Sequence, residues 1–581
     1  MQLRTNNIYA LLAIVGYFLL TRNLLLLWGV QPVGYVTNLY SMFPLSFYMS
    51  FIFCYFVAVF LIISKYSKLG ICLLCLNQLG VLLIPHMLGY YSIGRADNMS
   101  YIGEYLHIVQ SANVVSLDIY PASHIIGASI SLLSNIEAHN TSFIIPIVFS
   151  FVFIIGIYLF SRNIILNKTI RCLVLVSSFI FYIGPYTSLD SPNALFFSFM
   201  PLYLYCFHKY TASSNNISLA IIFVLMTLTI PFTHPFIVFF VFSVFLLHSI
   251  PRGYLLHSIP RDYSKIHLIK PSTFLLLAVV FGNWFIQSKL LTYSKKNYMS
   301  FIERITDPVF IKTTDKISKI QLGFFDYGWL INIFYGRFVI PTLFIFVSFI
   351  IVYRNRHILK SATFKGYPYL VLLYFAFLFL QFILYFNPLI SHQPDRIANL
   401  NFIVYAQVPL FSYALYLILI KDSIKLKNGL RVCVILTLIW SLSLFGCFDS
   451  PYIYRTNAAL TYNEVGGMSW LYNVKDNSNV SAPISQINRF YHLFGDFENK
   501  GITNDIPDHF GYINGSDTFI NKNLGASYVV LLTLDEMLYQ KVPGYTTVGR
   551  YTAADFSRFR RDDSINKIYD SLNIEIFKSA Y

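Results

Sequence analysis

Apolar runs of about twenty residues recur along this 581-residue chain from Asn7 to Cys447, and they constrain its fold more than any other feature. A run of this length crosses the hydrocarbon core of a bilayer as one helix. Only 12% of the residues are charged and 56% are hydrophobic, whereas an average soluble chain carries about 25% charged residues. Soluble, disordered and fibrous proteins are therefore excluded, and we predict an all-α polytopic membrane domain over residues 1–448.

The loops between these runs assign the two sides of the membrane, because short cytoplasmic loops are enriched in Lys and Arg. With a cytoplasmic N-terminus, 19 of the 30 Lys and Arg residues in this part of the chain lie in inner loops. We expect a multi-pass protein of the cell membrane with thirteen spans, at 8–28, 41–63, 69–90, 141–161, 172–186, 193–208, 217–232, 235–250, 272–291, 334–353, 367–386, 399–420 and 431–448.

The composition becomes polar after the last span. Residues 449–581 hold 12 Lys and Arg against 15 Asp and Glu, whereas residues 1–448 hold 30 against 12. The excess positive charge thus belongs to the membrane part, and the polar part has no basic stripe that would indicate nucleic-acid binding. A helical pattern at 463–472, an apolar run at 526–532 and a hairpin pattern near 568–577 predict a small α/β domain on the extracytoplasmic side.

Carboxylates are distributed even more unevenly than the cations. Ten of the twelve Asp and Glu residues before residue 449 fall in outer loops or at outer helix ends, and only Asp262 and Asp422 fall inside. Proton abstraction needs a base such as a carboxylate. We therefore look for a site in the outer loops at 91–140, 287–333 and 387–398.

The first outer loop carries the candidate base. Asp97 directly precedes a helical pattern, and it follows a membrane span at the level where a lipid-linked substrate would present its headgroup. It also has a simpler interpretation as the N-cap of that helix, since Asp caps helices well. Glu104 lies seven residues later on nearly the same helix face, so the two could form a carboxylate pair. Arg95 precedes Asp97, while Tyr120 and His124 open a second helical stretch.

These residues resemble the first external loop of the GT-C class of membrane glycosyltransferases, and most closely that of its archaeal and bacterial members. The resemblance covers the plan of spans and external domain as well. It implies that Asp97 is the catalytic base, that the donor is a polyprenyl-phosphate-linked sugar, and that transfer to an extracytoplasmic glycan, lipid or protein inverts the anomeric carbon. The matching residues are Gly94-Arg-Ala-Asp97 with Tyr101 and Glu104, and Tyr120-Pro121 with His124.

Cations in the other outer loops could bind the donor phosphate. The segment 287–333 is basic and amphipathic, a pattern that also suits a helix resting on anionic lipid headgroups. Arg337 lies at the same edge, and Arg396 begins a span at its outer end, where a helix dipole disfavours a cation. The resemblance implies that Arg396 grips phosphate; an ion pair with Asp395 is the alternative. His234, at a break between two spans, reaches the same boundary or is structural.

The sequence also departs from the class. Asn98 follows Asp97, so the adjacent acidic pair that would hold a divalent metal is missing. We assign no metal ligands and no certain cofactor, and a divalent metal stays open without support from such a pair. The Trp-Trp-Asp-Tyr-Gly motif of oligosaccharyltransferases is absent too, the nearest stretch being Ser469-Trp-Leu-Tyr-Asn473. We therefore expect transfer of a single hexose or pentose rather than of a whole oligosaccharide.

Two alternatives belong to other functional classes. A transporter or flippase for lipid-linked glycans would place ionisable residues at mid-membrane and would show paired broken helices in related halves. The sequence has neither an internal repeat of that kind nor a carboxylate within a span. An inactive membrane scaffold is the second alternative, and the sequence leaves it open.

Overall fold

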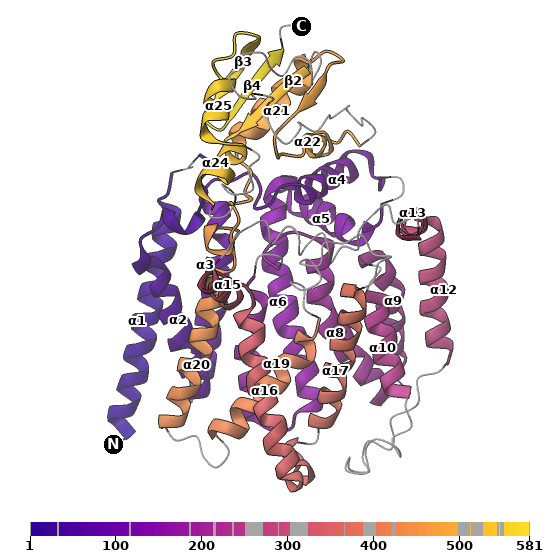
Figure 1. The fold of residues 1–581 in the computed structure, drawn as a ribbon. Coiled ribbons are helices and arrows are strands. Elements are labelled where there is room, and N and C mark those ends of the chain that lie inside the picture. Colours follow the sequence, from indigo (N-terminus) through magenta and orange to yellow (C-terminus); the bar gives the residue numbers. More distant parts are fainter. Residues whose placement is uncertain are drawn as a thin grey trace.

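The structure is a computed structural model in which long helices run side by side and a small domain sits at one end of the bundle (Figure 1). The N-terminus lies at the opposite end of the bundle from that domain. The residues that the structure describes are 2–31, 34–64, 66–115, 118–184, 187–212, 216–234, 237–249, 271–288, 290–302, 323–364, 366–386, 402–420, 426–497, 527–542 and 551–579, with Phe510, Tyr512 and Tyr545.

Each expected span coincides with a helix. Six helical stretches among the described residues are long and apolar enough to cross a membrane, so the chain is a multi-pass membrane protein by length and composition; the count of thirteen crossings stays a prediction. The bundle helices are α1 (Gln2–Trp28), α2 (Leu45–Ile63), α3 (Ser67–Met87), α6 (Ala138–Ile164), α7 (Lys168–Tyr182), α8 (Pro192–Ala212), α9 (Ile217–Thr233), α10 (Ile237–Ser249), α12 (Pro271–Gln287), α16 (Gly336–Arg354), α17 (Tyr367–Phe386), α19 (Val404–Leu415) and α20 (Leu426–Phe445).

Small residues allow neighbouring bundle helices to approach closely. A Cβ added to Gly70 of α3 would lie 2.6 Å from the backbone oxygen of Ala58 in α2, and one added to Gly156 of α6 would lie 2.9 Å from the backbone nitrogen of Leu202 in α8. Lipid tails are as apolar as leucine, so membrane helices associate through such packing rather than through hydrophobic burial.

Short elements connect the bundle helices. The amphipathic helix expected within 287–333 is described only as far as residue 302, and residues 303–322 lie outside the described part of the chain. The π-helical turn η3 leads directly into α16. The connecting elements are α13 (Leu290–Ile302), α15 (Phe324–Leu330), the π-helical turns η3 (Ile331–Tyr335) and η6 (Tyr416–Ile420), and the 3-10 turns η1 (Leu39–Met42), η4 (Arg356–Lys360), η5 (Ala362–Phe364) and η7 (Pro451–Ile453).

Two helices of the first expected outer loop lie across the end of the bundle, beneath the small domain (Figure 1). They are α4 (Asp97–Ser111) and α5 (Pro121–Ser134), and both predicted helices are thereby confirmed. The N-cap position of α4 belongs to Ala96, with a positive φ of 56°, and Asp97 is the first helical residue. The interpretation of Asp97 as the N-cap is therefore wrong. Gly127 of α5 lets the ring of Tyr105 pack against its backbone.

The small domain is the predicted α/β domain. Its sheet has the order β1-β2-β4-β3, in which β1 and β2 are parallel and the other neighbours are antiparallel. One face of β2 packs on an aromatic cluster that includes Phe556 and Phe559, and the other face belongs to the main core of the molecule. The elements are α21 (Tyr462–Val474), β1 (Asn479–Ser481), α22 (Ile487–Leu493), β2 (Ser527–Leu532), α24 (Thr533–Lys541), α25 (Ala553–Phe559), β3 (Ile565–Ser571) and β4 (Ile574–Ser579).

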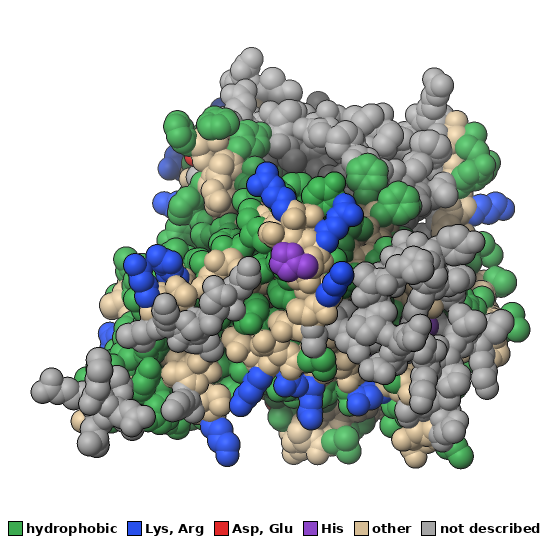
Figure 2. Space-filling model, turned by 90° about the horizontal axis from the view of Figure 1, so that it is seen from below, with side chains coloured by type: hydrophobic (Ala, Val, Ile, Leu, Met, Phe, Trp, Pro, Cys, Tyr) green, Lys and Arg blue, Asp and Glu red, His purple; other side chains and the backbone are tan. Residues whose placement is uncertain are grey.

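The opposite end of the bundle is basic. Figure 2 shows this face, and many Lys and Arg side chains lie on it while acidic side chains are scarce among the described residues. The structure therefore gathers the basic loops on the face remote from the C-terminal domain.

A buried ion pair attaches the C-terminal domain to the segment that leads into α4. Arg95 Nη2 lies 2.7 and 2.8 Å from the two carboxylate oxygens of Glu464 and also donates to the backbone oxygen of Ala459 at 3.1 Å. The same carboxylate completes the capping box of α21 with Thr461. Backbone hydrogen bonds between Ser92 and Leu460 continue the junction.

We expect Glu464→Ala to cost about 3–5 kcal/mol, because it would leave the Arg95 guanidinium buried without its carboxylate. Increased hydrogen exchange in α21 and in residues 91–96, together with a lower unfolding temperature, would report the loss. Asp476→Ala breaks the exposed pair with Lys578 and is the control, since such surface pairs contribute little. Equal effects of the two changes would contradict a structural role for the buried pair.

Candidate functional site

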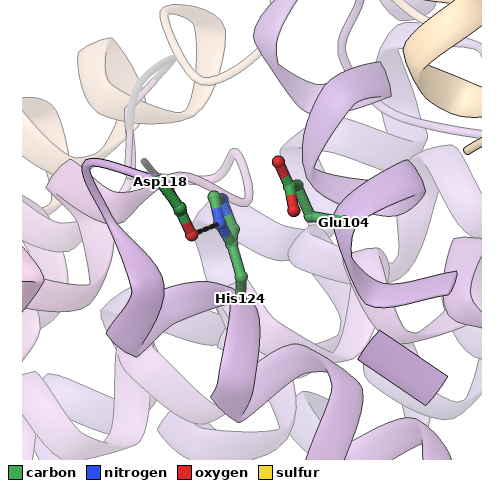
Figure 3. Close-up of side chains that lie close together, drawn as sticks. All are labelled: Glu104, Asp118 and His124. Atoms are coloured by element: carbon green, nitrogen blue, oxygen red, sulfur yellow. Dashed lines mark hydrogen bonds and ion pairs between the residues drawn. The ribbon is translucent and has the colours of Figure 1, made fainter. Parts of the chain in front are cut away.

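Two carboxylates and an imidazole form a cluster between α4 and α5. Glu104 comes from α4, His124 from the first turn of α5, and Asp118 from the loop before it. One ligand atom from each residue lies within 4.8 Å of those of the other two. Figure 3 shows the carboxylates of Asp118 and Glu104 on either side of the His124 ring. We call these three residues the Glu-Asp-His cluster.

The Asp118 carboxylate orients the imidazole. His124 Nδ1 lies 2.6 Å from Asp118 Oδ2, and because an ionised carboxylate only accepts, Nδ1 carries the proton and donates it. The other ring nitrogen, Nε2, is buried and has no hydrogen-bond partner within the described part of the chain. A carboxylate on one nitrogen that leaves the other available is the arrangement of metal-binding histidines.

With Asp118 holding Nδ1, His124 Nε2 and the Glu104 carboxylate are the atoms of the cluster that could hold a divalent cation. An imidazole nitrogen with carboxylate oxygens suits Zn²⁺ or Mn²⁺. Adjacent acids, the usual sequence sign of a metal site in this class, are absent from the first outer loop. The sequence signal of this cluster is instead Asp118 six residues before His124, with Glu104 one helix earlier.

Asp97 lies at the start of α4, outside the Glu-Asp-His cluster. Its Oδ1 accepts a hydrogen bond of 2.8 Å from Nη2 of Arg489, a residue of α22 that the sequence analysis did not single out. The side chains of Asp97 and Arg489 are 30% and 27% exposed, so both remain within reach of solvent. The sequence suggests that Asp97 and Glu104 form a carboxylate pair. In the structure Asp97 pairs with Arg489, and Glu104 lies with Asp118 and His124.

Two further predicted residues lie next to the cluster. The rings of Tyr120 and His234 stack with their centroids 5.3 Å apart, although they are more than a hundred residues apart in sequence. The backbone N–H of Tyr120 donates to Asp118 Oδ1 at 2.8 Å. His234 is buried at the end of α9. The structure therefore brings Tyr120 and His234 together at the start of α5, where Tyr120 is bonded to Asp118 of the cluster.

The predicted cations have different surroundings. Arg95 is engaged by Glu464, and its guanidinium lies 5.6 Å from the ring centre of Tyr35. A substrate-binding role for Arg95 stays a prediction, while its observed contacts are those of the domain junction. Arg396 lies outside the described residues.

Arg337 is a buried cation at the start of α16. Its Nη1 donates to the backbone oxygen of Ile183, and Gly184 provides the space in which the guanidinium lies. Nε and Nη2 are buried with no hydrogen-bond partner among the described residues. An uncompensated buried charge is costly. Arg337 therefore presents two N–H donors that an anion would satisfy.

Asp190 is a buried carboxyl group that the sequence analysis left without a role. Its Oδ2 accepts a hydrogen bond of 2.6 Å from the Tyr105 hydroxyl, and its backbone oxygen accepts one of 2.6 Å from Nδ2 of Asn98. Burial raises the pKa of Asp190 to about 7, and the Tyr105 hydrogen bond opposes part of that rise. Asp190 in the loop before α8 thus contacts α4 at Asn98 and at Tyr105, which lie seven residues apart on one face of the helix.

Comparisons with known proteins leave the family of the chain unassigned. No family model matches the sequence, and no curated protein matches it. Among solved structures, the chain is similar to that of ArnT from Cupriavidus metallidurans bound to undecaprenyl phosphate, with 9% sequence identity and a TM-score of 0.47 over 89% of this chain and 98% of that one. A score at this level does not establish a shared fold, so the function has to be argued from the residues of the chain itself.

The cluster predicts metal binding. We expect the purified protein to bind one Zn²⁺ or Mn²⁺ ion, measured by calorimetry and by metal analysis after dialysis. His124→Gln should abolish this binding because it removes the nitrogen ligand, and Asp118→Asn should weaken it about 10- to 100-fold. His107→Gln, on the same helix as Glu104 but outside the cluster, is the control. Unchanged binding by His124→Gln would contradict the assignment.

Asp190 predicts a dependence of stability on pH. Because its folded pKa is raised from 3.8 to about 7, its contribution to stability is complete at low pH and is lost as the pH rises through 7. Asp190→Asn stays neutral and can still accept from Tyr105. Its unfolding temperature should therefore fall less between pH 5 and pH 8 than that of the unchanged protein. Parallel profiles would contradict the prediction, and the exposed Glu137→Gln change is the control.

Proposed function

We propose that the chain is a GT-C-type membrane glycosyltransferase that transfers a single hexose or pentose from a polyprenyl-phosphate donor to an extracytoplasmic acceptor. The observation that carries the proposal is the position of α4 and α5. They lie between the end of the membrane bundle and the C-terminal domain (Figure 1). They carry Asp97, Glu104 and His124, and Asp118 lies in the loop between them. A lipid headgroup from the bilayer and a polar acceptor from solvent can both reach such a place.

Asp97 is the group proposed to take the proton. The acceptor hydroxyl or amide would attack the anomeric carbon while the Asp97 carboxylate accepts its proton, so that the new bond forms as the bond to the lipid phosphate breaks. Asp97 suits this role because its side chain is partly exposed to solvent. It is also the first residue of α4, a helix that is held in place by the contact of Asn98 with Asp190. Attack from the face opposite the leaving phosphate gives the inverting outcome.

Cations are proposed to stabilise the departing lipid phosphate. Arg337 has two buried N–H groups without a partner among the described residues, and guanidinium groups bind phosphate through such donors. Arg396 is proposed to act with it, on the sequence pattern alone. A divalent cation in the Glu-Asp-His cluster would add positive charge close to α4.

The proposed orientation places the N-terminus in the cytoplasm and the C-terminal domain outside. The basic face in Figure 2 supports it, because cytoplasmic loops carry the excess of Lys and Arg. The acceptor would then be a glycan, lipid or protein of the cell envelope.

The alternative of a flippase finds less support in the structure. It requires ionisable residues near the middle of the spans. Among the described residues, the buried carboxyl group Asp190 lies in the loop before α8, whereas Arg337 begins α16 but lies inside the apolar stretch Phe324–Arg354. An inactive scaffold would not need a buried Arg337 whose Nε and Nη2 have no partner among the described residues.

Asp97→Asn tests the proposal. We expect it to lower sugar transfer by a factor of about 10²–10⁴, because the amide cannot accept the proton. Transfer would be measured with membranes containing the protein and a panel of synthetic polyprenyl-phosphate monosaccharides, and expression and unfolding temperature would verify folding. Glu137→Gln, at another carboxylate on the same side of the bundle, is the control. Full transfer by a folded Asp97→Asn protein would exclude Asp97 as the base.

A further inference from the structure

Helix α22 of the C-terminal domain lies directly on α4. At Gly103, an added Cβ would collide with the backbone oxygen of His492, so only glycine allows the two helices to approach so closely. His492 Nδ1 also lies 2.9 Å from Ser100 Oγ, and the ring of Phe497 contacts those of His107 and His492. The position of α22 is therefore set by its contact with the helix that carries Asp97.

Arg489 of α22 directs all three parts of its guanidinium to specific acceptors. Nη2 donates to Asp97 Oδ1 at 2.8 Å, Nη1 donates to Ser100 Oγ at 2.9 Å, and Nε donates to Gln486 Oε1 at 3.3 Å. Ser100 accepts from Arg489, and its hydroxyl can donate to His492 Nδ1 when that nitrogen carries no proton. Burial lowers the pKa of His492, and the charge of Arg489 lowers it further, which favours the neutral ring that this bond requires.

Stability alone does not account for the pair of Arg489 with Asp97. Partly exposed ion pairs contribute at most about 1 kcal/mol. The C-terminal domain already has a stronger attachment in the buried Arg95–Glu464 pair, whose carboxylate is inaccessible to solvent. Removal of Arg489 should therefore leave the domain in place, and the effect of the residue should appear at Asp97.

We propose that Arg489 is a positioning residue through which the C-terminal domain completes the site. This inference rests on the proposed function. Arg489 holds the Asp97 carboxylate in one rotamer, with Ser100 fixing the plane of the guanidinium. When the acceptor gives its proton to Asp97, the carboxyl group becomes neutral and the ion pair with Arg489 is lost. Release of that proton to solvent forms the ion pair again. The C-terminal domain thus supplies part of the catalytic arrangement.

The first test needs no substrate. Asp97 can be labelled with a water-soluble carbodiimide and glycinamide, and the rate of labelling can be followed by mass spectrometry of the peptide. We expect Arg489→Met to raise this rate several-fold, because the guanidinium at 2.8 Å covers one oxygen of the Asp97 carboxylate and shields it from the reagent. Arg560→Met is the matched control, since Arg560 pairs with Glu536 and Glu575 elsewhere in the same domain. An unchanged rate in Arg489→Met would overturn the proposal.

The second test separates positioning from attachment. Arg489→Met should lower kcat for sugar transfer about 10- to 100-fold with little change in donor KM, while unfolding temperature and hydrogen exchange in α21 stay as they were. Arg489→Lys should recover part of the loss, because an ammonium group can pair with Asp97 but lacks the planar fork that also reaches Ser100. If Arg489→Met is as active as Arg560→Met, or if its loss of activity matches its loss of folded protein, the inference is overturned and the proposed function is left intact. A lack of transfer by the unchanged protein with every donor would instead overturn the proposed function.

Discussion

The buried pair of Arg95 with Glu464 is the interaction on which the arrangement of the site depends. A guanidinium in that place needs a carboxylate, because an unpaired charge would be costly to bury. Glu464 also caps α21, so one side chain both begins a helix of the C-terminal domain and fixes the chain two residues before Asp97. The second contact, from Arg489 to Asp97, can then form with little cost in ordering, since α21 already brings α22 to α4.

The helices and strands that could be predicted from the sequence are those that a local pattern of residues determines. The apolar runs predict each bundle helix, and the helices that begin near Asp97 and Pro121 follow from apolar spacing and from proline at a first helical position. The strand at 527–532 and the terminal hairpin follow from runs of β-branched and aromatic residues. The short β1 and the helix α22 carry too few residues to produce a pattern, and their place is set by tertiary contact.

The residues of the site also fall into two groups, those that a local sequence pattern indicates and those that only tertiary contacts reveal. Glu104, Tyr120 and His124 could be chosen because they lie in one loop at a membrane boundary. The partners of Arg95 and Asp97 lie more than 360 residues away along the chain. No local signal marks Glu464 or Arg489 as those partners, because ordinary helix capping and ordinary surface charge explain both residues equally well from the sequence.

The two ends of the loop between α7 and α8 suggest how the bundle and the external helices act together. At one end Ile183 accepts from Arg337, and at the other end Asp190 accepts from Asn98 and Tyr105 of α4. An anion that bound the buried donors of Arg337 would thus act on the same short loop that holds the helix of Asp97. Both described ends of this connection carry contacts of the site, so we expect occupation of Arg337 and the orientation of Asp97 to be coupled. In a transferase this coupling would prepare the base only when the lipid donor is bound.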